Sequence, residues 1–396
     1  MSASTAAPII ADRASLRAPH LPTALDAIPD WSKRIPALDG LRGVAILMVL
    51  MSHHIFGFGL RTNSRILSAT LIAGKLSWSG VDLFFVLSGF LIGGILLDAK
   101  YSPHYFKTFY IRRACRIFPL YFLVTGSILL IRHFFAPVLH ESPISSMPTI
   151  AYLTLTQNLW VRHGAIGALV PTWSLCVEEQ FYLTIPMAVR FLHRRQLVWM
   201  LASIVILAPM LRLLLSPLGH GDLLCYETTP CRADALSLGV LAAVFVRNPV
   251  LWRSLTRHRA WLRTGLFILF LGIVYMTWRR YSPFLPPMNT LGLSWMAMFY
   301  AFLLLAVISS SRSLVGRLLC SRPLKRLGML AYCTYLLHFM FRNAGWWVFA
   351  NLIGSSETWN RILGGLLGLV ATLVAASLSW RFFEKPILKL GHKFQY

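Results

Sequence analysis

The sequence predicts an all-α membrane protein, a polytopic bundle of about ten transmembrane helices with both termini in the cytoplasm. Of its 396 residues, 56% are hydrophobic and only 13% are charged, whereas soluble domains carry about a quarter charged residues. The formal charge of +24 lies in short Lys and Arg clusters between apolar runs, the pattern that orients membrane proteins. We therefore expect a lipid bilayer, and no nucleic acid, as the partner of this charge.

The apolar runs define the spans, because a bilayer core needs roughly 20 mostly apolar residues per helix. Eight runs meet this length and two shorter ones complete the set. The eight are 37–58, 78–97, 116–135, 198–215, 263–278, 290–309, 329–352 and 361–383, and the shorter two are 175–192 and 234–246. When the spans alternate in direction, most Lys and Arg residues fall on one side, which places both termini inside.

One transmembrane domain, residues 35–386, is the economical interpretation. Residues 1–34 are rich in Ala, Pro and Ser and lack a signal-peptide core, so we expect a disordered cytoplasmic N-terminal tail. Residues 387–396 would form a short cytoplasmic C-terminal tail. The small-residue pairs Gly89 with Gly93 and Gly364 with Gly368 could let helices approach closely.

The six cysteines lack zinc-like spacing, so no metal site is expected. Cys225 and Cys231 share a predicted outer loop, where a disulfide and two reduced thiols are both open possibilities.

Ionisable groups inside a bilayer are costly, so each is a functional candidate. In the first span, Arg42 and His53 stand eleven positions apart, which returns to almost the same helix face after about 16 Å of rise. A histidine is suited to take a proton from a hydroxyl as a general base. The alternative is an interfacial histidine that only marks the helix end.

The segment YIRRACRIFPLY places Arg113 and Arg116 one turn apart at the predicted start of the third span. Two guanidinium groups on one face can clamp a phosphate, although ordinary positive-inside anchoring is also open.

The segment PTWSLCVEEQFYL places Trp173, Ser174, Glu178, Glu179 and Tyr182 at the predicted outer mouth of the fourth span. One carboxylate could hold an acceptor hydroxyl or orient His53, and the other could simply favour a helix start.

Three further polar groups lie within predicted spans: Asp82, Asp234 and His338. Helix-packing hydrogen bonds and substrate contacts are both open for them. Arg232 and Asp234 could also pair with each other.

Absent signatures narrow the enzyme class. The sequence has no G-x-S-x-G, H-E-x-x-H or Walker-type loop, which argues against a serine hydrolase, a zincin and an ATP-driven pump. A secondary transporter with an intramembrane ionisable pathway is the leading alternative from another class, but the paired repeats typical of transporters are not found. A non-catalytic acyl-relay partner is a second alternative.

Seven motifs in order resemble the acyltransferase-3 membrane proteins, which acylate sugars of O-antigens, capsules, Nod factors and some antibiotics. They are LDGLRG…H, WSGVDLFFVLSGFLI, RRACRIFPLY, TWSLCVEEQFYL, RADALSLG, YLLH and WRFFEKP, between Pro36 and Pro386. The family's extracellular SGNH extension does not follow the last span, so a stand-alone form is expected.

The resemblance implies roles for individual residues. His53 falls on the essential histidine of the arginine-ten-residues-histidine motif, and Arg113 and Arg116 fall on the R-x-x-R motif associated with acyl-CoA. In the S-L-x-x-E-E segment, Cys176 departs from the family pattern, where a small residue such as Ser is commoner.

The predicted function is therefore acyl transfer, with acetyl-CoA as donor, in a multi-pass protein of the bacterial inner membrane. The acceptor would be a hydroxyl of a surface glycan or glycolipid, with a small secreted metabolite as the alternative. We expect the catalytic groups to be His53, Arg42, Glu178 and Glu179, and the acyl-CoA ligands to be Arg42, Arg113 and Arg116. The predicted substrate-binding residues are Trp173, Ser174, Tyr182, Asp82, Asp234 and His338.

Overall fold

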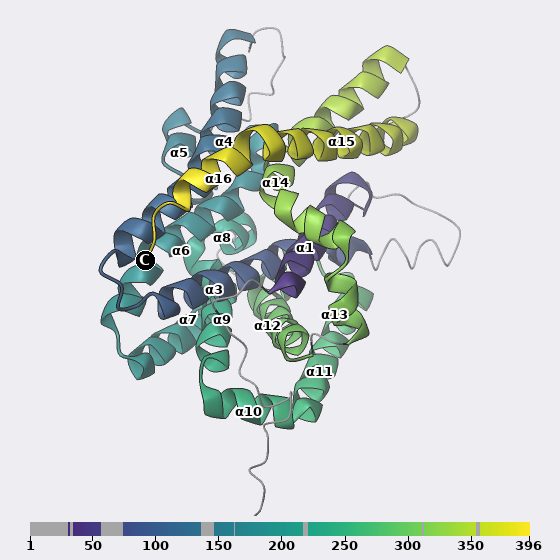
Figure 1. Ribbon diagram of the computed structural model, residues 1–396. Helices are drawn as coiled ribbons and strands as arrows, with labels where there is room; N and C mark the ends of the chain where they lie inside the picture. The colour runs from purple at the N-terminus through teal and green to yellow at the C-terminus, as the bar shows by residue number, and fades with distance from the viewer. Residues whose placement is uncertain are drawn as a thin grey trace, which may run out of the picture.

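The computed structural model describes residues 31, 35–56, 74–135, 146–161, 163–216, 221–310, 313–353 and 357–396. All regular structure in these ranges is helical (Figure 1), so the predicted all-α polytopic membrane bundle is confirmed. Apart from Trp31, the predicted N-terminal tail lies outside the described residues.

Each predicted span coincides with a long helix. These are α1 (Pro36–His54), α3 (Gly80–Asp98), α4 (Tyr105–Phe135), α6 (Trp173–Phe191), α7 (Arg194–Leu215), α9 (Thr229–Val246), α11 (Arg259–Trp278), α12 (Leu293–Ser309), α14 (Arg322–Val348) and α15 (Glu357–Ser379). The short helices are α5 (Thr149–Leu153), α8 (Gly221–Glu227), α10 (Pro249–Arg257), α13 (Leu314–Leu319) and α16 (Lys385–Gly391). Single turns are η2 (Lys75–Ser79), η3 (Gln157–Leu159), η4 (Gly167–Thr172), η6 (Met288–Gly292), η7 (Phe349–Ile353) and η8 (Trp380–Glu384).

Seven helical segments in the described ranges are long and apolar enough to cross a membrane. Helices α1, α6 and α14 match predicted spans but are not among the seven. The predicted site residues contribute to the lower hydropathy of these three helices: Arg42 and His53 in α1, Glu178 and Glu179 in α6, and His338 in α14. Four basic residues outside the predicted site lower the hydropathy of α14 further. The count of ten spans remains a prediction.

Two predicted boundaries were too narrow. Helix α4 begins at Tyr105 rather than near residue 116, so Arg113 and Arg116 lie inside the helix and not at its start. Helix α9 begins at Thr229 rather than near residue 234, so Arg232 lies within it. Basic residues hid both starts from a search for apolar runs.

Helices α1 and α14 pack backbone against backbone. A Cβ atom added to Gly328 would overlap the carbonyl oxygen of Asp39, and one added to Gly43 would overlap that of Leu324. Small residues allow such close approach between membrane helices. His53 and His338 also meet, and each lies ten residues after the glycine of its own helix. The two helices therefore run in the same direction, as the predicted first and ninth spans must.

Both predicted glycine pairs lie at helix contacts. Gly89 and Gly93 of α3 face α9, and most of these two central helices is buried. Gly364 and Gly368 of α15 face α14 at Gly345 and Arg342. The order of these contacts shows that α14 and α15 run in opposite directions, as successive spans should.

Segments predicted to be cytoplasmic contact one another. Arg247 forms two 2.7 Å hydrogen bonds to Asp98, and Lys100 donates to the carbonyl of Leu192 at 2.7 Å. Near the C-terminus, the carbonyl of Phe394 accepts a hydrogen bond from Arg112 at 2.8 Å. In this region α16 lies along α4 (Figure 1). This clustering is what the predicted alternation of spans requires.

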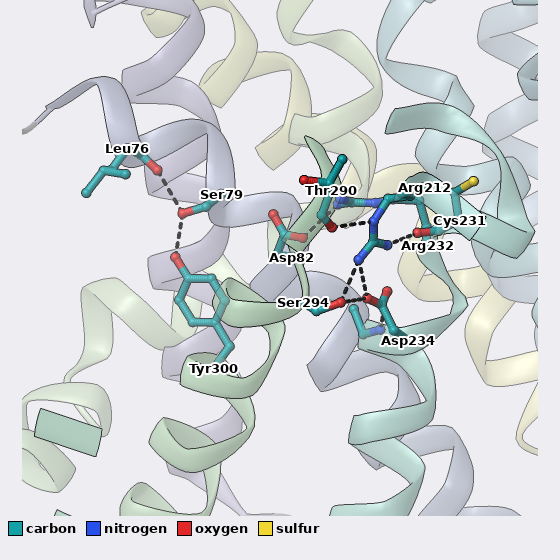
Figure 2. A network of polar contacts seen from close by, with 11 residues as sticks. Leu76, Ser79, Asp82, Arg212, Cys231, Arg232, Asp234, Thr290, Ser294 and Tyr300 are labelled. Atoms are coloured by element: carbon teal, nitrogen blue, oxygen red, sulfur yellow. Dashed lines mark hydrogen bonds and ion pairs between the residues drawn. The ribbon is translucent and has the colours of Figure 1, made fainter. Parts of the chain in front are cut away.

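Two ion pairs lie buried between α3, α7, α9 and α12 (Figure 2). Arg212 pairs with Asp234 at 2.9 Å, and Arg232 pairs with Asp82 at 2.7 Å, with both guanidinium side chains at most 1% exposed. The predicted pairing of Arg232 with Asp234 is wrong, because each arginine reaches a carboxylate on a different helix. Pairing across helices satisfies groups that would be costly alone in a membrane.

Arg212 makes further contacts that join three helical segments. It donates to the carbonyls of Thr290, at 2.8 Å, and Cys231, and to the hydroxyl of Ser294 at 2.5 Å. The carbonyl of Arg212 lies 3.8 Å from the thiol of Cys225. Cys225 and Cys231 are both buried.

We expect Gly328→Ala to destabilise the fold by about 1–3 kcal/mol, because the added methyl group overlaps the backbone of α1 and the helices must separate. Gly126→Ala is the matched control, since no atom lies within 4 Å of a Cβ at that position. Unfolding in detergent micelles of increasing SDS content measures both variants. Equal stability of the two variants would contradict the close packing.

We expect Arg212→Met to destabilise the fold by about 3–5 kcal/mol, because it leaves Asp234 buried without its cation. Arg279→Ala, which removes an exposed arginine at the end of α11, should change stability by about 0.5 kcal/mol or less. The same unfolding measurement applies. A neutral effect of the Arg212 substitution would show that the buried pair contributes little.

Candidate functional site

Two cavities lie one after the other along the face of α1 that carries Arg42 and His53. We call the first the arginine cavity: it encloses about 100 Å³ and is lined by Arg42, Ser88, Arg113, Arg116, Ser174, Glu178, Tyr182, Tyr332 and Tyr335, with apolar neighbours. We call the second the histidine cavity: it encloses about 570 Å³ and includes His53 in its lining. The eleven-residue spacing therefore directs one side chain into each cavity.

Helices α1 and α4 supply the three cations of the arginine cavity. Arg42, Arg113 and Arg116 lie close enough to repel one another, and none forms an ion pair with another described residue. The ring of Tyr182 lies 6.0 Å from the guanidinium group of Arg113. Three arginines around one small cavity favour an anionic ligand with several oxygen acceptors.

Glu178 is the carboxylate of this cavity. It accepts hydrogen bonds from Ser88 at 2.8 Å and from Tyr182 at 3.2 Å, and its charge attracts Arg42 and Arg113. The neighbouring Glu179 has one buried carboxylate oxygen without a hydrogen-bond partner. Glu178 thus holds the polar wall of the arginine cavity, and its hydrogen-bond partners do not include His53.

Aromatic side chains dominate the histidine cavity. Trp78, Trp173, Tyr226, Phe284 and Phe339 are among the lining residues, as are the charged residues Lys75, Glu227 and Arg280. The rings of Trp173 and Tyr226 lie 5.0 Å apart, and those of Tyr226 and Phe284 lie 4.8 Å apart. Most of these residues come from ends and loops that the sequence places on the outer side.

A thin wall separates the cavities, because Val81 and Tyr335 line both of them. The hydroxyl of Tyr335 donates to the carbonyl of Pro171 at 2.9 Å and shares a 2.6 Å hydrogen bond with Ser174. These contacts fix the position of a phenol that lines both cavities.

His53 has a second histidine as its partner. Nδ1 of His53 lies 3.0 Å from Nε2 of His338, and Nδ1 of His338 lies 2.6 Å from the carbonyl oxygen of Tyr335. His338 is fully buried. A residue predicted to bind substrate or to pack between helices therefore contacts the candidate base directly.

The structure brings most predicted site residues together and separates a few. Arg42, Arg113, Arg116, Ser174, Glu178 and Tyr182 line the arginine cavity, whereas His53 and Trp173 line the histidine cavity. Glu178 and Tyr182 were expected at the outer mouth of the span, but they lie deeper along α6. Asp82 and Asp234 line neither cavity and are held in the buried ion pairs.

Sequence reasoning missed Ser88, Tyr226 and Tyr335. The signal for Tyr335 was present, because it precedes His338 by about one turn in the YLLH segment and must share its face. Ser88 and Tyr226 carry no comparable signal, since they reach the cavities only through the packing of α3 and α8.

Comparison with known proteins adds independent findings. A model of the acyltransferase domain matches residues 35–381. The peptidoglycan O-acetyltransferase OatA of Listeria monocytogenes is 30% identical over 382 residues, covering 91% of this chain and 56% of the relative. YrhL of Bacillus subtilis, named as a candidate peptidoglycan O-acetyltransferase, is 30% identical with the same coverage. The O-acetyltransferase OatA of Staphylococcus aureus is 26% identical, covering 91% of this chain and 58% of the relative.

The chain spans little more than half the length of these relatives. No solved structure matches it significantly. The family match includes every residue that lines the arginine cavity, together with His53 and His338. The chain therefore belongs to the acyltransferase-3 family of membrane proteins.

Proposed function

We propose that the protein transfers an acetyl group from cytoplasmic acetyl-CoA to a hydroxyl of a cell-surface glycan, as a multi-pass protein of the bacterial inner membrane. One observation carries the proposal: an anion-attracting cavity and a histidine cavity lie one after the other along α1 and share the wall formed by Val81 and Tyr335. A two-substrate transfer needs such an arrangement, because the donor and the acceptor must meet at one base.

The arginine cavity is suited to the charged part of acyl-CoA. Guanidinium groups bind phosphate oxygens through paired, charge-assisted hydrogen bonds, and Arg42, Arg113 and Arg116 surround the cavity. The cavity of about 100 Å³ is too small for the whole cofactor. Its phosphates would therefore lie among the arginines, with the pantetheine arm extending towards His53 and the adenosine outside.

The histidine cavity is suited to a sugar. Trp173, Tyr226 and Phe284 offer flat apolar surfaces, against which the apolar faces of sugar rings pack, while Lys75 and Glu227 offer polar contacts at the lining. The relatives are named for acetyl transfer to peptidoglycan. These two observations favour a glycan or glycolipid acceptor over a small metabolite.

The chemistry follows from His53 acting as a general base. The imidazole takes the proton of the acceptor hydroxyl, while the oxygen of that hydroxyl attacks the thioester carbonyl carbon. The carbon–sulfur bond then breaks, and the thiolate of CoA takes the proton back from the imidazolium. The products are an acetyl ester and CoA, with no other reactant consumed. A cavity closed to bulk water disfavours hydrolysis of the thioester.

We expect Arg113→Ala/Arg116→Ala to weaken acetyl-CoA binding about 100-fold, because it removes two charge-assisted contacts. His53→Ala should leave binding unchanged and reduce turnover roughly 10²- to 10⁴-fold. Binding is measured by calorimetry in nanodiscs. Turnover is measured as acetyl transfer from labelled acetyl-CoA to N-acetylglucosamine oligosaccharides.

Arg253→Ala/Arg257→Ala is the matched control, since it removes two exposed arginines from α10, on the same predicted side. Unchanged binding in the control and loss in the cavity variant would support the clamp. If the wild-type protein neither binds acetyl-CoA nor turns it over, the transferase proposal fails and transport becomes the leading alternative.

A substitution in the shared wall tests the route of the pantetheine arm between the two cavities. Val81→Trp places a large ring where the pantetheine arm would pass, so we expect binding of acetyl-CoA to persist while turnover falls at least about tenfold. Val274→Trp makes the same substitution at a half-exposed position of α11 and should not affect turnover. Full turnover in the Val81 variant would exclude this route between the cavities.

A further inference from the structure

The histidine pair restricts where its protons can lie. Nδ1 of His338 is 2.6 Å from the carbonyl oxygen of Tyr335. A carbonyl oxygen can only accept a hydrogen bond, so this nitrogen of His338 carries hydrogen. The assignment follows from the chemistry of the acceptor alone.

The second contact extends the assignment to His53. Nε2 of His338 lies 3.0 Å from Nδ1 of His53, and a hydrogen bond between two ring nitrogens needs one that carries hydrogen and one that does not. A neutral imidazole has a single N–H group, so Nε2 of His338 is the acceptor. His53 must then carry its hydrogen on Nδ1, which leaves Nε2 of His53 with a free lone pair.

The surroundings favour the neutral form of both rings. His338 is fully buried in a membrane helix, where an isolated charge is costly. The guanidinium group of Arg342 lies near both histidines and repels a second cation. Arg342 itself stacks on the ring of Phe339, 3.8 Å away, and donates to Asn343 at 2.9 Å.

We propose that His338 is a positioning residue that selects the Nδ1–H tautomer of His53 and so keeps Nε2 of His53 free for the acceptor hydroxyl. Its effect on catalysis rests on the proposed acetyl transfer, whereas its effect on the tautomer does not. His54 does not share this role, because its Nδ1 atom is hydrogen-bonded to the carbonyl of Gly365 at 2.9 Å and its Nε2 atom has no hydrogen-bond partner among the described residues.

His338 also serves the later step of the reaction. When Nε2 of His53 takes the hydroxyl proton, the Nδ1–H group of the imidazolium still faces a neutral acceptor, and the hydrogen bond becomes charge-assisted. The orienting group of a catalytic histidine is often a carboxylate. A neutral imidazole anchored to a backbone carbonyl does the same work in a membrane without burying a second charge.

Two substitutions separate positioning from packing. His338→Phe fills the space but offers no acceptor, and we expect kcat to fall about 10²-fold with the KM for acetyl-CoA unchanged. His338→Gln places an amide oxygen close to the original Nε2 position and should restore kcat to within about tenfold of wild type. The carbonyl of Val49 is a second hydrogen-bond acceptor beside His53. It therefore limits how far kcat falls in the Phe variant.

His54→Asn is the matched control, because it removes the neighbouring imidazole and keeps a donor for Gly365. Its kcat should stay within about twofold of wild type. Equal loss of kcat in the Phe and Gln variants, or no loss in either, would overturn the positioning role.

Nitrogen-15 NMR of histidine-labelled protein in nanodiscs tests the tautomer without any assay of activity. We expect the Nδ1–H form of His53 in the wild type and the Gln variant, and a mixture with the Nε2–H form in the Phe variant. An Nε2–H form in the wild type overturns the proposal. The Nδ1–H form in a wild type that transfers no acetyl group would support the hydrogen bond and refute the proposed function instead.

Discussion

The close packing of α1 against α14 is the contact on which the arrangement of the site depends. Gly43 and Gly328 bring the two backbones together with no room for a methyl group. Because the helices run in the same direction from that point, His53 meets His338 at 3.0 Å, ten residues beyond the glycine on each helix. The same face of α14 carries Tyr335 to the boundary between the cavities. The glycine contact between α1 and α14 thus positions three parts of the site relative to one another: the candidate base His53, its partner His338, and Tyr335 in the shared wall.

The membrane explains how charge is distributed around this contact. Arg212 and Arg232 lie deep in the bundle, and each is neutralised by a carboxylate from another helix, as the cost of an intramembrane charge demands. Arg42, Arg113 and Arg116 have no such ion pair among the described residues. Glu178 attracts Arg42 and Arg113, and Asp39 attracts Arg42, but three cations face these two carboxylates, which leaves positive charge for a ligand. Arg212 and Arg232 instead stabilise the fold.

The residues that share a helix face could be predicted from the sequence, because their spacing is local. Their partners on other helices could not, because these depend on how the helices pack. The spacing of Arg42 and His53, and of Arg113 and Arg116, depends only on helix geometry, so their shared faces could be predicted. The pairing of Asp234 with Arg212 instead of Arg232 depends on how α7, α9 and α12 meet, which no single segment encodes. The contact between His53 and His338 likewise joins residues 285 positions apart. Individual candidates were therefore visible in the sequence, but their partners were not.

The different sizes of the two cavities bear on what each would select. The arginine cavity encloses about 100 Å³ and the histidine cavity about 570 Å³. A narrow cavity lined by fixed cations discriminates by charge and shape, whereas a wide aromatic one tolerates variation in its ligand. Under the proposed function, the donor would be strictly defined and the acceptor loosely defined. Tyr335 lines both cavities, and its bonds to Pro171 and Ser174 fix the phenol at their boundary, so under the proposed function the thioester would pass beside this ring to reach His53.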